Sequence, residues 1–145
     1  MQKGMGLACA IAVTALVSSN AANAADKIKL GSLRRQWDAF FRNFDLLLCP
    51  VAASAAFPRD QKTDRPFRQI QVNGRLENYN DQLFWAGLAS LAYLPATVAP
   101  IGLTTTGLPV GMQIIGPFMQ DKTTIEFARL LAVEIGGFRT PPKFA

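Results

Sequence analysis

Two apolar segments near the C-terminal end of the chain constrain its fold more than any other feature. Residues 96–103 read ATVAPIGL and residues 110–116 read VGMQIIG, joined by the short segment TTTGLP. Because Gly107 in this connection can adopt a positive φ, the pattern predicts two neighbouring strands joined by a turn. Pro100 has no N–H to donate to a neighbouring strand, which predicts a sheet edge or a bulge at that residue. Close approaches of the backbone to neighbouring groups are predicted at Gly102, Gly111 and Gly116.

An amphipathic helix and a buried strand are predicted before this pair. Apolar side chains recur with helical spacing, and Ser32 precedes them as a suitable N-cap. The residues of this stripe are Leu33, Trp37, Phe40, Phe41 and Phe44. Residues 44–50 read FDLLLCP, and this apolar run closed by proline predicts a short buried strand. Cys49 in the strand is interpreted as a small buried hydrophobe, with a reactive thiol as the alternative.

The middle of the chain predicts a long loop and a second helix. Residues 51–74 show no periodicity, and the segment VNGR at residues 72–75 predicts a turn at the end of the loop. Asn78 or Asn80 then caps a helix that is apolar on nearly all sides, a pattern typical of the interior of a larger protein. Its apolar positions are Leu83, Phe84, Trp85, Gly87, Leu88 and Leu91.

A last helix is predicted between Gly116 and Gly136. Asp121 or Thr123 is the expected N-cap, and residues 123–126, TTIE, have the form of a capping box. Gly136 and the following glycine are expected to end the helix. The predicted buried face consists of Ile125, Phe127, Ala128, Leu131, Ala132 and Ile135.

The composition excludes several kinds of catalytic site. The 145 residues allow one domain at most, and the sequence contains no histidine. A Ser-His-Asp triad, a Cys-His dyad and most zinc sites need imidazole, so this chain cannot form them alone. The cysteines Cys9 and Cys49 form no metal-binding motif, and the acidic residues show no metal-loop spacing. We therefore expect no metal and no cofactor.

The formal charge of +5 comes from scattered cations, with no run longer than the pair of Arg34 and Arg35. A nucleic-acid interface needs cations gathered on one face or along one helix. We therefore expect no nucleic-acid partner.

The N-terminus predicts an export signal over residues 1–24. Lys3 supplies positive charge, residues 7–17 are apolar or small, and the small residues of Ala22-Asn23-Ala24 suit signal-peptidase cleavage before Ala25. The apolar run is shorter than the roughly 20 residues of a spanning helix, so we expect no stable membrane anchor. A functional signal implies a periplasmic or secreted protein; without it, the expected location is cytoplasmic. The alternative interpretation of this segment is a buried helix of the domain that follows.

Residues 25–32, ADKIKLGS, form a linker in this interpretation. Their start resembles the first strand of periplasmic solute-binding proteins. The alternative is a polar linker without that origin.

Several motifs resemble the C-terminal portion of amidase-signature hydrolases. They are the segments LPATVAPIG at residues 94–102 and GLPVGMQIIG at residues 107–116, an Arg-x-x-Trp-x-x-Phe-Phe helix, a strand ending in Leu-Cys-Pro, and the closing helix. The resemblance covers residues 33–145. It implies an α/β fold that is a partial amidase-signature domain, with part of a mixed sheet and flanking helices.

The resemblance also implies which groups perform the chemistry. The family cleaves amides with a serine, a second serine in a cis peptide and a lysine, and the lysine is followed much later in the chain by a segment rich in glycine and serine. The serines of this chain do not lie in such a segment, and no lysine matches the family motif. These serines are Ser18, Ser19, Ser32, Ser54 and Ser90. We therefore assign no catalytic residue.

Substrate-binding residues are not assigned either, although the family places the long loop after residue 50 near the substrate entrance. Four aromatic residues have two interpretations, core packing or the lining of an acyl pocket in a complete enzyme. They are Tyr79, Phe84, Trp85 and Tyr93.

Two functions are compatible with these features. The first is a C-terminal fragment of an amidase, which converts carboxylic acid amides to acid plus ammonia or amine, inactive alone because the Ser-Ser-Lys segment is missing. The second is a non-catalytic secreted binding or scaffold module derived from an amidase. The expected partner is the missing N-terminal amidase half, or a second copy through a self-association surface, because the predicted helices carry more apolar surface than they can bury.

Overall fold

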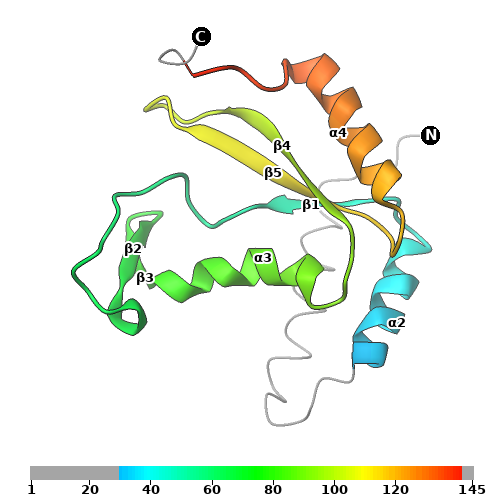
Figure 1. Cartoon of the computed structure of the whole chain (residues 1–145), viewed down its shortest axis with the longest axis horizontal. Coiled ribbons are helices and arrows are strands. Elements are labelled where there is room, and N and C mark those ends of the chain that lie inside the picture. Colours follow the sequence, from blue (N-terminus) through cyan, green and yellow to red (C-terminus); the bar gives the residue numbers. More distant parts are fainter. Residues whose placement is uncertain (1–29, 142–145) are drawn as a thin grey trace.

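The computed structural model describes residues 30–141, whose arrangement is shown in Figure 1. In chain order the elements are α2 (Leu30–Phe41), β1 (Leu47–Pro50), η1 (Arg65–Phe67), β2 (Gln69–Val72), β3 (Arg75–Asn78), η2 (Tyr79–Gln82), α3 (Leu83–Ser90), β4 (Ala96–Leu103), β5 (Pro109–Ile115) and α4 (Asp121–Ile135). Strands β1, β5 and β4 form a sheet in that order, and β2 pairs with β3 in a second sheet. All of these pairs are antiparallel.

The predicted pair of strands at the C-terminal end is confirmed. Strand β4 pairs with β5, and Gly107 in the connection has a φ of 81°. The register shifts between Pro100 and Gly102, and β4 is at the edge of its sheet, so Pro100 marks both a bulge and an edge. No group lies within 4 Å of a Cβ built on Gly102, so the close approach predicted there is wrong. Its φ of 151° instead explains why a residue without a side chain suits the bulge.

The sheet separates two layers of helices (Figure 1). On one face, α2 and α3 bury Trp37 and Leu88 against Leu47 and Ile115 of β1 and β5. On the other face, α4 lies over β4, where the hydroxyls of Thr97 and Thr124 are 2.9 Å apart. Because strand residues alternate between faces, neighbouring residues of β5 serve both layers.

The first helix begins before its predicted cap. Helix α2 starts at Leu30, so Ser32 lies inside its first turn and the N-cap prediction is wrong. The predicted stripe is nevertheless the buried one, since Leu33, Trp37 and Phe40 are in the core. Helical spacing therefore identified the buried face correctly, although it did not locate the helix start.

The segment predicted as one long loop contains a hairpin. Strands β2 and β3 are joined by Asn73 and Gly74, whose φ values of 50° and 79° fit a tight turn with two left-handed residues. The turn prediction at residues 72–75 is therefore confirmed, while the loop ends earlier than predicted. Asn78 caps η2 by accepting a hydrogen bond from the N–H of Asn80 at 2.8 Å.

The start of α4 differs from its predicted cap. Gln120 is at the N-cap position without a side-chain cap, and Asp121 and Thr123 are within the first turn, so the capping box is wrong. Glu126 binds Arg129 instead, with Oε1 and Nη2 2.7 Å apart. The predicted helix end is confirmed, because Gly136 has a φ of 94° and donates its N–H to Ala132.

The buried face of α4 is also narrower than predicted. Thr124 is the buried residue of this helix, while Phe127, Ala128, Leu131 and Ala132 are half-buried. The side chains of Ile125 and Ile135 are exposed, so their predicted burial is wrong. Exposed apolar residues on α4 are Ile125, Leu130, Val133 and Ile135.

Residues 1–29 lie outside the described residues, and they include the whole predicted export signal and most of the predicted linker. Within residues 30–141, no helix combines the length and the apolar character that crossing a bilayer requires.

Candidate functional site

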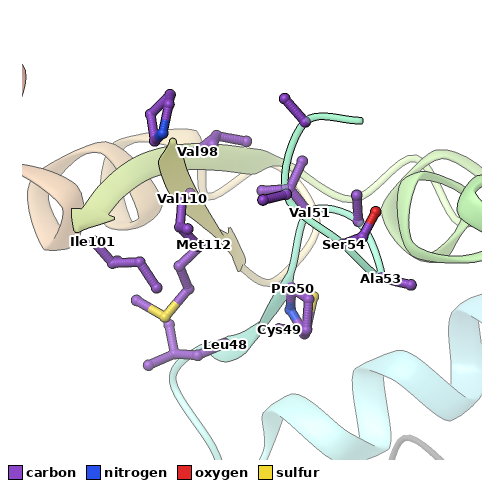
Figure 2. A pocket seen from close by; sticks show the side chains of 15 residues that line it. Leu48, Cys49, Pro50, Val51, Ala53, Ser54, Val98, Ile101, Val110 and Met112 are labelled. Carbon is purple, nitrogen blue, oxygen red and sulfur yellow. The ribbon is translucent and has the colours of Figure 1, made fainter. Parts of the chain in front are cut away.

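An apolar hollow lies where β4, β5 and the end of β1 meet the loop after β1. Its volume is about 660 Å³. Figure 2 shows the side chains of Leu48, Ile101 and Met112 gathered on one side, with Val51 and Ser54 contributed by the loop. None of its 15 lining residues carries a charge, and Ser54 supplies the one side-chain hydroxyl among them.

At this hollow, β5 lies close to β4 and to the loop after β1. A Cβ on Gly111 would lie 3.1 Å from Val98 Cγ1 and 3.5 Å from Val51 Cγ2, so glycine allows strand and loop to come together. The approach predicted for Gly111 is therefore confirmed. Val98 itself is 55% exposed, so much of this apolar side chain remains open to solvent.

Two polar groups beside this loop have no hydrogen-bond partner among the described residues. They are Ser54 Oγ and Gln82 Nε2, and both atoms are buried. Gln82 Oε1 does accept the N–H of Ala53 at 2.8 Å, which ties the loop to η2. Buried polar groups are nearly always paired, so unpaired ones need a specific explanation.

The side-chain amide of Gln113 is also buried, and it connects β5 to β1 and α3. Gln113 Nε2 donates to the carbonyl oxygen of Trp85 at 3.2 Å and lies 3.6 Å from Cys49 Sγ. Cys49 is 7% exposed in the hydrophobic core, which confirms its interpretation as a small buried hydrophobe. The sequence analysis missed Gln113, although a glutamine inside an apolar strand is itself a signal of a specific buried contact.

The four aromatic residues considered for an acyl pocket do not form one cluster, although Phe84 and Trp85 contact each other. Trp85 packs against the core, and its ring meets Phe84 edge to face with centroids 5.1 Å apart. Tyr79 contacts Phe57, with centroids 6.0 Å apart. Tyr93 is exposed and lies under the guanidinium of Arg34.

Arg34 joins three parts of the molecule and was also missed by the sequence analysis. Its guanidinium carbon is 5.1 Å from the ring centre of Tyr93 and 4.4 Å from that of Phe118. Its Nε donates to the carbonyl oxygen of Ala92 at 3.3 Å. Arg34 therefore connects α2 to the segments that follow α3 and precede α4, a structural role for one member of the predicted cation pair.

The described serines are not arranged as nucleophiles. Ser90 Oγ donates to the carbonyl oxygen of Ala86 at 3.0 Å, and Ser54 Oγ has no partner among residues 30–141. Ser32 lies within α2. In this part of the chain, no cluster of three or more acidic or cysteine side chains could hold a metal ion.

Comparison with known proteins places these features in one family. The model of the family described as Amidase matches residues 7–125. A glutamyl-tRNA(Gln) amidotransferase subunit from Zymomonas mobilis is 35% identical over 111 residues, which cover 77% of this chain and 20% of that protein. The protein of the same name from Rhizorhabdus wittichii is 36% identical over 111 residues, with the same two shares.

The matched range overlaps the predicted export signal, because it begins at residue 7. The alternative interpretation, in which this segment belongs to the domain, is consistent with that overlap. The signal itself stays a prediction.

Solved structures agree on the fold. The structure described as a crystal structure of amidase has a TM-score of 0.61 and 23% identity, covering 74% of this chain and 23% of that chain. The corresponding glutamyl-tRNA(Gln) amidotransferase subunit from Thermotoga maritima has a TM-score of 0.55 and 22% identity, covering 92% of this chain and 29% of that chain. These likenesses confirm the predicted α/β partial amidase fold. The chain spans about one fifth of the length of the curated relatives described above, and it belongs to the amidase family.

Proposed function

We propose that this chain is the C-terminal portion of an amidase domain and that it hydrolyses amides only together with the rest of such a domain. The observation that carries the proposal is the match to the family over residues 7–125 by a chain that spans about one fifth of its relatives. The reaction is conversion of a carboxylic acid amide to the acid plus ammonia or amine. The chain contributes the strands and helices described above, and the missing portion contributes the reacting groups.

The chemistry of the described residues supports this division. A serine becomes a nucleophile when a neighbouring base accepts its proton. Ser90 donates its hydroxyl to a backbone carbonyl, and Ser54 contacts no base among the residues that the structure describes. The chain also has no histidine to act as that base.

Reconstitution with a divided relative tests the proposal. The Zymomonas mobilis relative is divided where its match to this chain begins, and its larger part is co-expressed with the full 145-residue chain. Ammonia release is measured on a panel of aliphatic and aryl primary amides. The two parts of the relative, expressed separately and reunited, are the positive control that selects the amides to be scored.

We expect hydrolysis by the mixed pair and none by this chain alone. Hydrolysis by the chain alone would show that it carries its own reacting groups. A folded chain that binds the larger part without restoring hydrolysis, while the reunited relative is active, would contradict the amidase role. That result would favour the binding or scaffold module.

A further inference from the structure

Among the apolar surfaces of the described chain that are open to solvent, the outer side of α4 and the hollow beside β4 and β5 differ in their chemistry. The outer side of α4 exposes Leu130 and Val133, but these residues alternate with the exposed ion pair of Glu126 and Arg129. Charged side chains interspersed in this way are typical of a surface that faces water. The hollow beside β4 and β5, by contrast, has no charged residue among its 15 lining residues.

The hollow also contains an incomplete hydrogen-bonding site. Ser54 Oγ is buried beside it and has no partner within residues 30–141. Leaving a buried hydroxyl unpaired is unfavourable, so a partner supplied from outside these residues would remove that cost. No buried side-chain oxygen or nitrogen of α4 is unpaired in the same way.

The edge of β4 limits how another segment can join this surface. Pro100 lacks an N–H, and the register shifts between Pro100 and Gly102, so the edge is poorly suited to pairing with a further long strand. The exposed side chains of Val98 and Ile101 remain available beside the hollow. Its volume of about 660 Å³ is enough for several side chains of another segment.

We propose that this hollow is the docking surface for the portion of the amidase domain that the chain lacks. Apolar side chains of that portion fill the space beside Val98, Ile101 and Met112, and one of its hydrogen-bonding groups reaches Ser54. The size of the matched relatives supports this occupant, because this chain covers 20% of each of them and the remaining portion is therefore large. The inference rests on the proposed function.

Matched charge substitutions on the two apolar surfaces test the location. Val98→Asp places a carboxylate in the hollow, and Val133→Asp places one on the outer side of α4, where the side chain is 70% exposed. Binding of the full chain to the larger part of the Zymomonas mobilis relative is measured by calorimetry. We expect Val98→Asp to weaken binding at least tenfold and Val133→Asp to change it less than twofold.

Val98→Thr and Val133→Thr are added because an introduced carboxylate could unfold the chain. Threonine keeps the shape of valine, so these variants test the surface with less risk of unfolding. Circular dichroism of every variant checks that it is folded. We expect Val98→Thr to weaken binding severalfold and Val133→Thr to leave it unchanged.

Ser54→Ala gives a second test, because it should affect the stability of the isolated chain and its affinity for the larger part differently. In the chain alone, this change removes an unpaired hydroxyl, so the stability should stay the same or increase. In the complex it removes a hydrogen bond, so binding should weaken by about two- to tenfold. A purely structural role for Ser54 would lower the stability of the isolated chain and leave the affinity unchanged.

The outcomes separate this inference from the proposed function. If the unmodified chain does not bind although the relative's own two parts do, both fail. If the unmodified chain binds and restores hydrolysis but Val98→Asp and Val98→Thr bind equally well, the location alone is wrong. If the chain forms dimers on sedimentation and Val98→Asp dissociates them, a second copy occupies the hollow and the proposed occupant is wrong.

Discussion

Gly116 is located where the end of β5 meets the first turn of α4, and its lack of a side chain is required there. A Cβ at this position would lie 2.7 Å from Cγ2 of Thr124. Thr124 cannot easily move, because it is 1% exposed and its hydroxyl bonds the carbonyl oxygen of Asp121 at 2.8 Å. The close approach predicted for Gly116 is therefore confirmed.

We expect Gly116→Ala to lower the free energy of unfolding by about 1–3 kcal/mol, because the added methyl overpacks a buried contact. The matched control is Gly87→Ala in α3, where no group lies within 4 Å of the added Cβ. That change should raise the free energy of unfolding by about 0.5–1 kcal/mol, since alanine favours a helix over glycine. Urea unfolding measures both, and equal effects of the two changes would contradict the steric explanation.

Asp60 organises a turn in the exposed loop before η1. Its Oδ1 accepts the N–H groups of Lys62 and Thr63 at 2.9 and 3.0 Å. Hydrogen bonding by the Thr63 side chain, and then by these backbone groups, lowers the pKa of Asp60 from 3.8 to about 2. Because the ionised carboxylate is the form that is stabilised, its contribution is complete above pH 3.8 and is lost as the pH falls through about 2.

We expect NMR titration of the Asp60 carboxyl carbon to give a midpoint near pH 2, with matching changes at the Lys62 and Thr63 amides. Asp60→Asn keeps an oxygen acceptor without the ionisation, so those amides should show no transition there. A midpoint near 3.8 in the unmodified chain would mean that the turn does not form in solution.

At the scale of elements, one pair of hydroxyls joins α4 to the sheet. Thr97 of β4 and Thr124 of α4 have their Oγ1 atoms 2.9 Å apart. Both positions accept valine with little change in shape, so a double-mutant cycle can isolate the hydrogen bond. Thr124→Val alone should lower the free energy of unfolding by about 1–2 kcal/mol, because Thr97 loses its partner.

The double variant Thr97→Val/Thr124→Val should lose less stability than the sum of the two single changes. Thr124→Val leaves the Thr97 hydroxyl without its partner, whereas the double variant removes that hydroxyl as well. Thr97→Val alone leaves Thr124 bonded to the carbonyl oxygen of Asp121. Chemical unfolding of the four proteins gives the coupling energy. Strict additivity would show that the two hydroxyls are independent in solution.

The elements also show which sequence patterns were informative. The hairpin of β4 and β5 was predictable because its turn glycine, its bulge at Pro100 and its apolar strands agree with one another. The hairpin of β2 and β3 was missed because four-residue strands carry too short a period to recognise, although the Asn73-Gly74 turn was visible. The N-cap predictions for α2 and α4 failed because Ser32 and Thr123 are suitable capping residues that the structure places inside helices.

At the scale of the whole molecule, the described chain has a small core and a large apolar surface. The core is formed mainly by α2, α3, β1 and β5, while the exposed large hydrophobic residues lie on α3, β4 and α4, in the η1–β3 region and in the connecting segments. Large contiguous apolar surfaces are rare on folded monomers unless they contact a partner. This agrees with a chain that spans about one fifth of its relatives and supports the proposal that it works beside a larger portion.

The hollow could not be found from the sequence. Residues 48–56 read LCPVAASAA, and their uncharged composition was the signal available, but the sequence shows no periodicity there. Their proximity to Val98 and Gly111 depends on two strands far apart in the chain becoming neighbours in one sheet. The same long-range pairing places Gln113 beside Cys49, and the packing of α2 against the segment after α3 places Arg34 beside Tyr93.

The sequence by itself determined the main hairpin and the stripe of α2 that is buried, because both depend on local spacing of apolar residues, glycine and proline. Its motifs also carried the resemblance to the amidase family, which the comparisons confirm. It also excluded imidazole chemistry, since that depends on composition alone. Only the tertiary structure decided which apolar residues stay exposed, which polar atoms are buried without partners and where the hollow forms. These properties depend on contacts between segments that are distant in the chain, and local spacing contains no information about them.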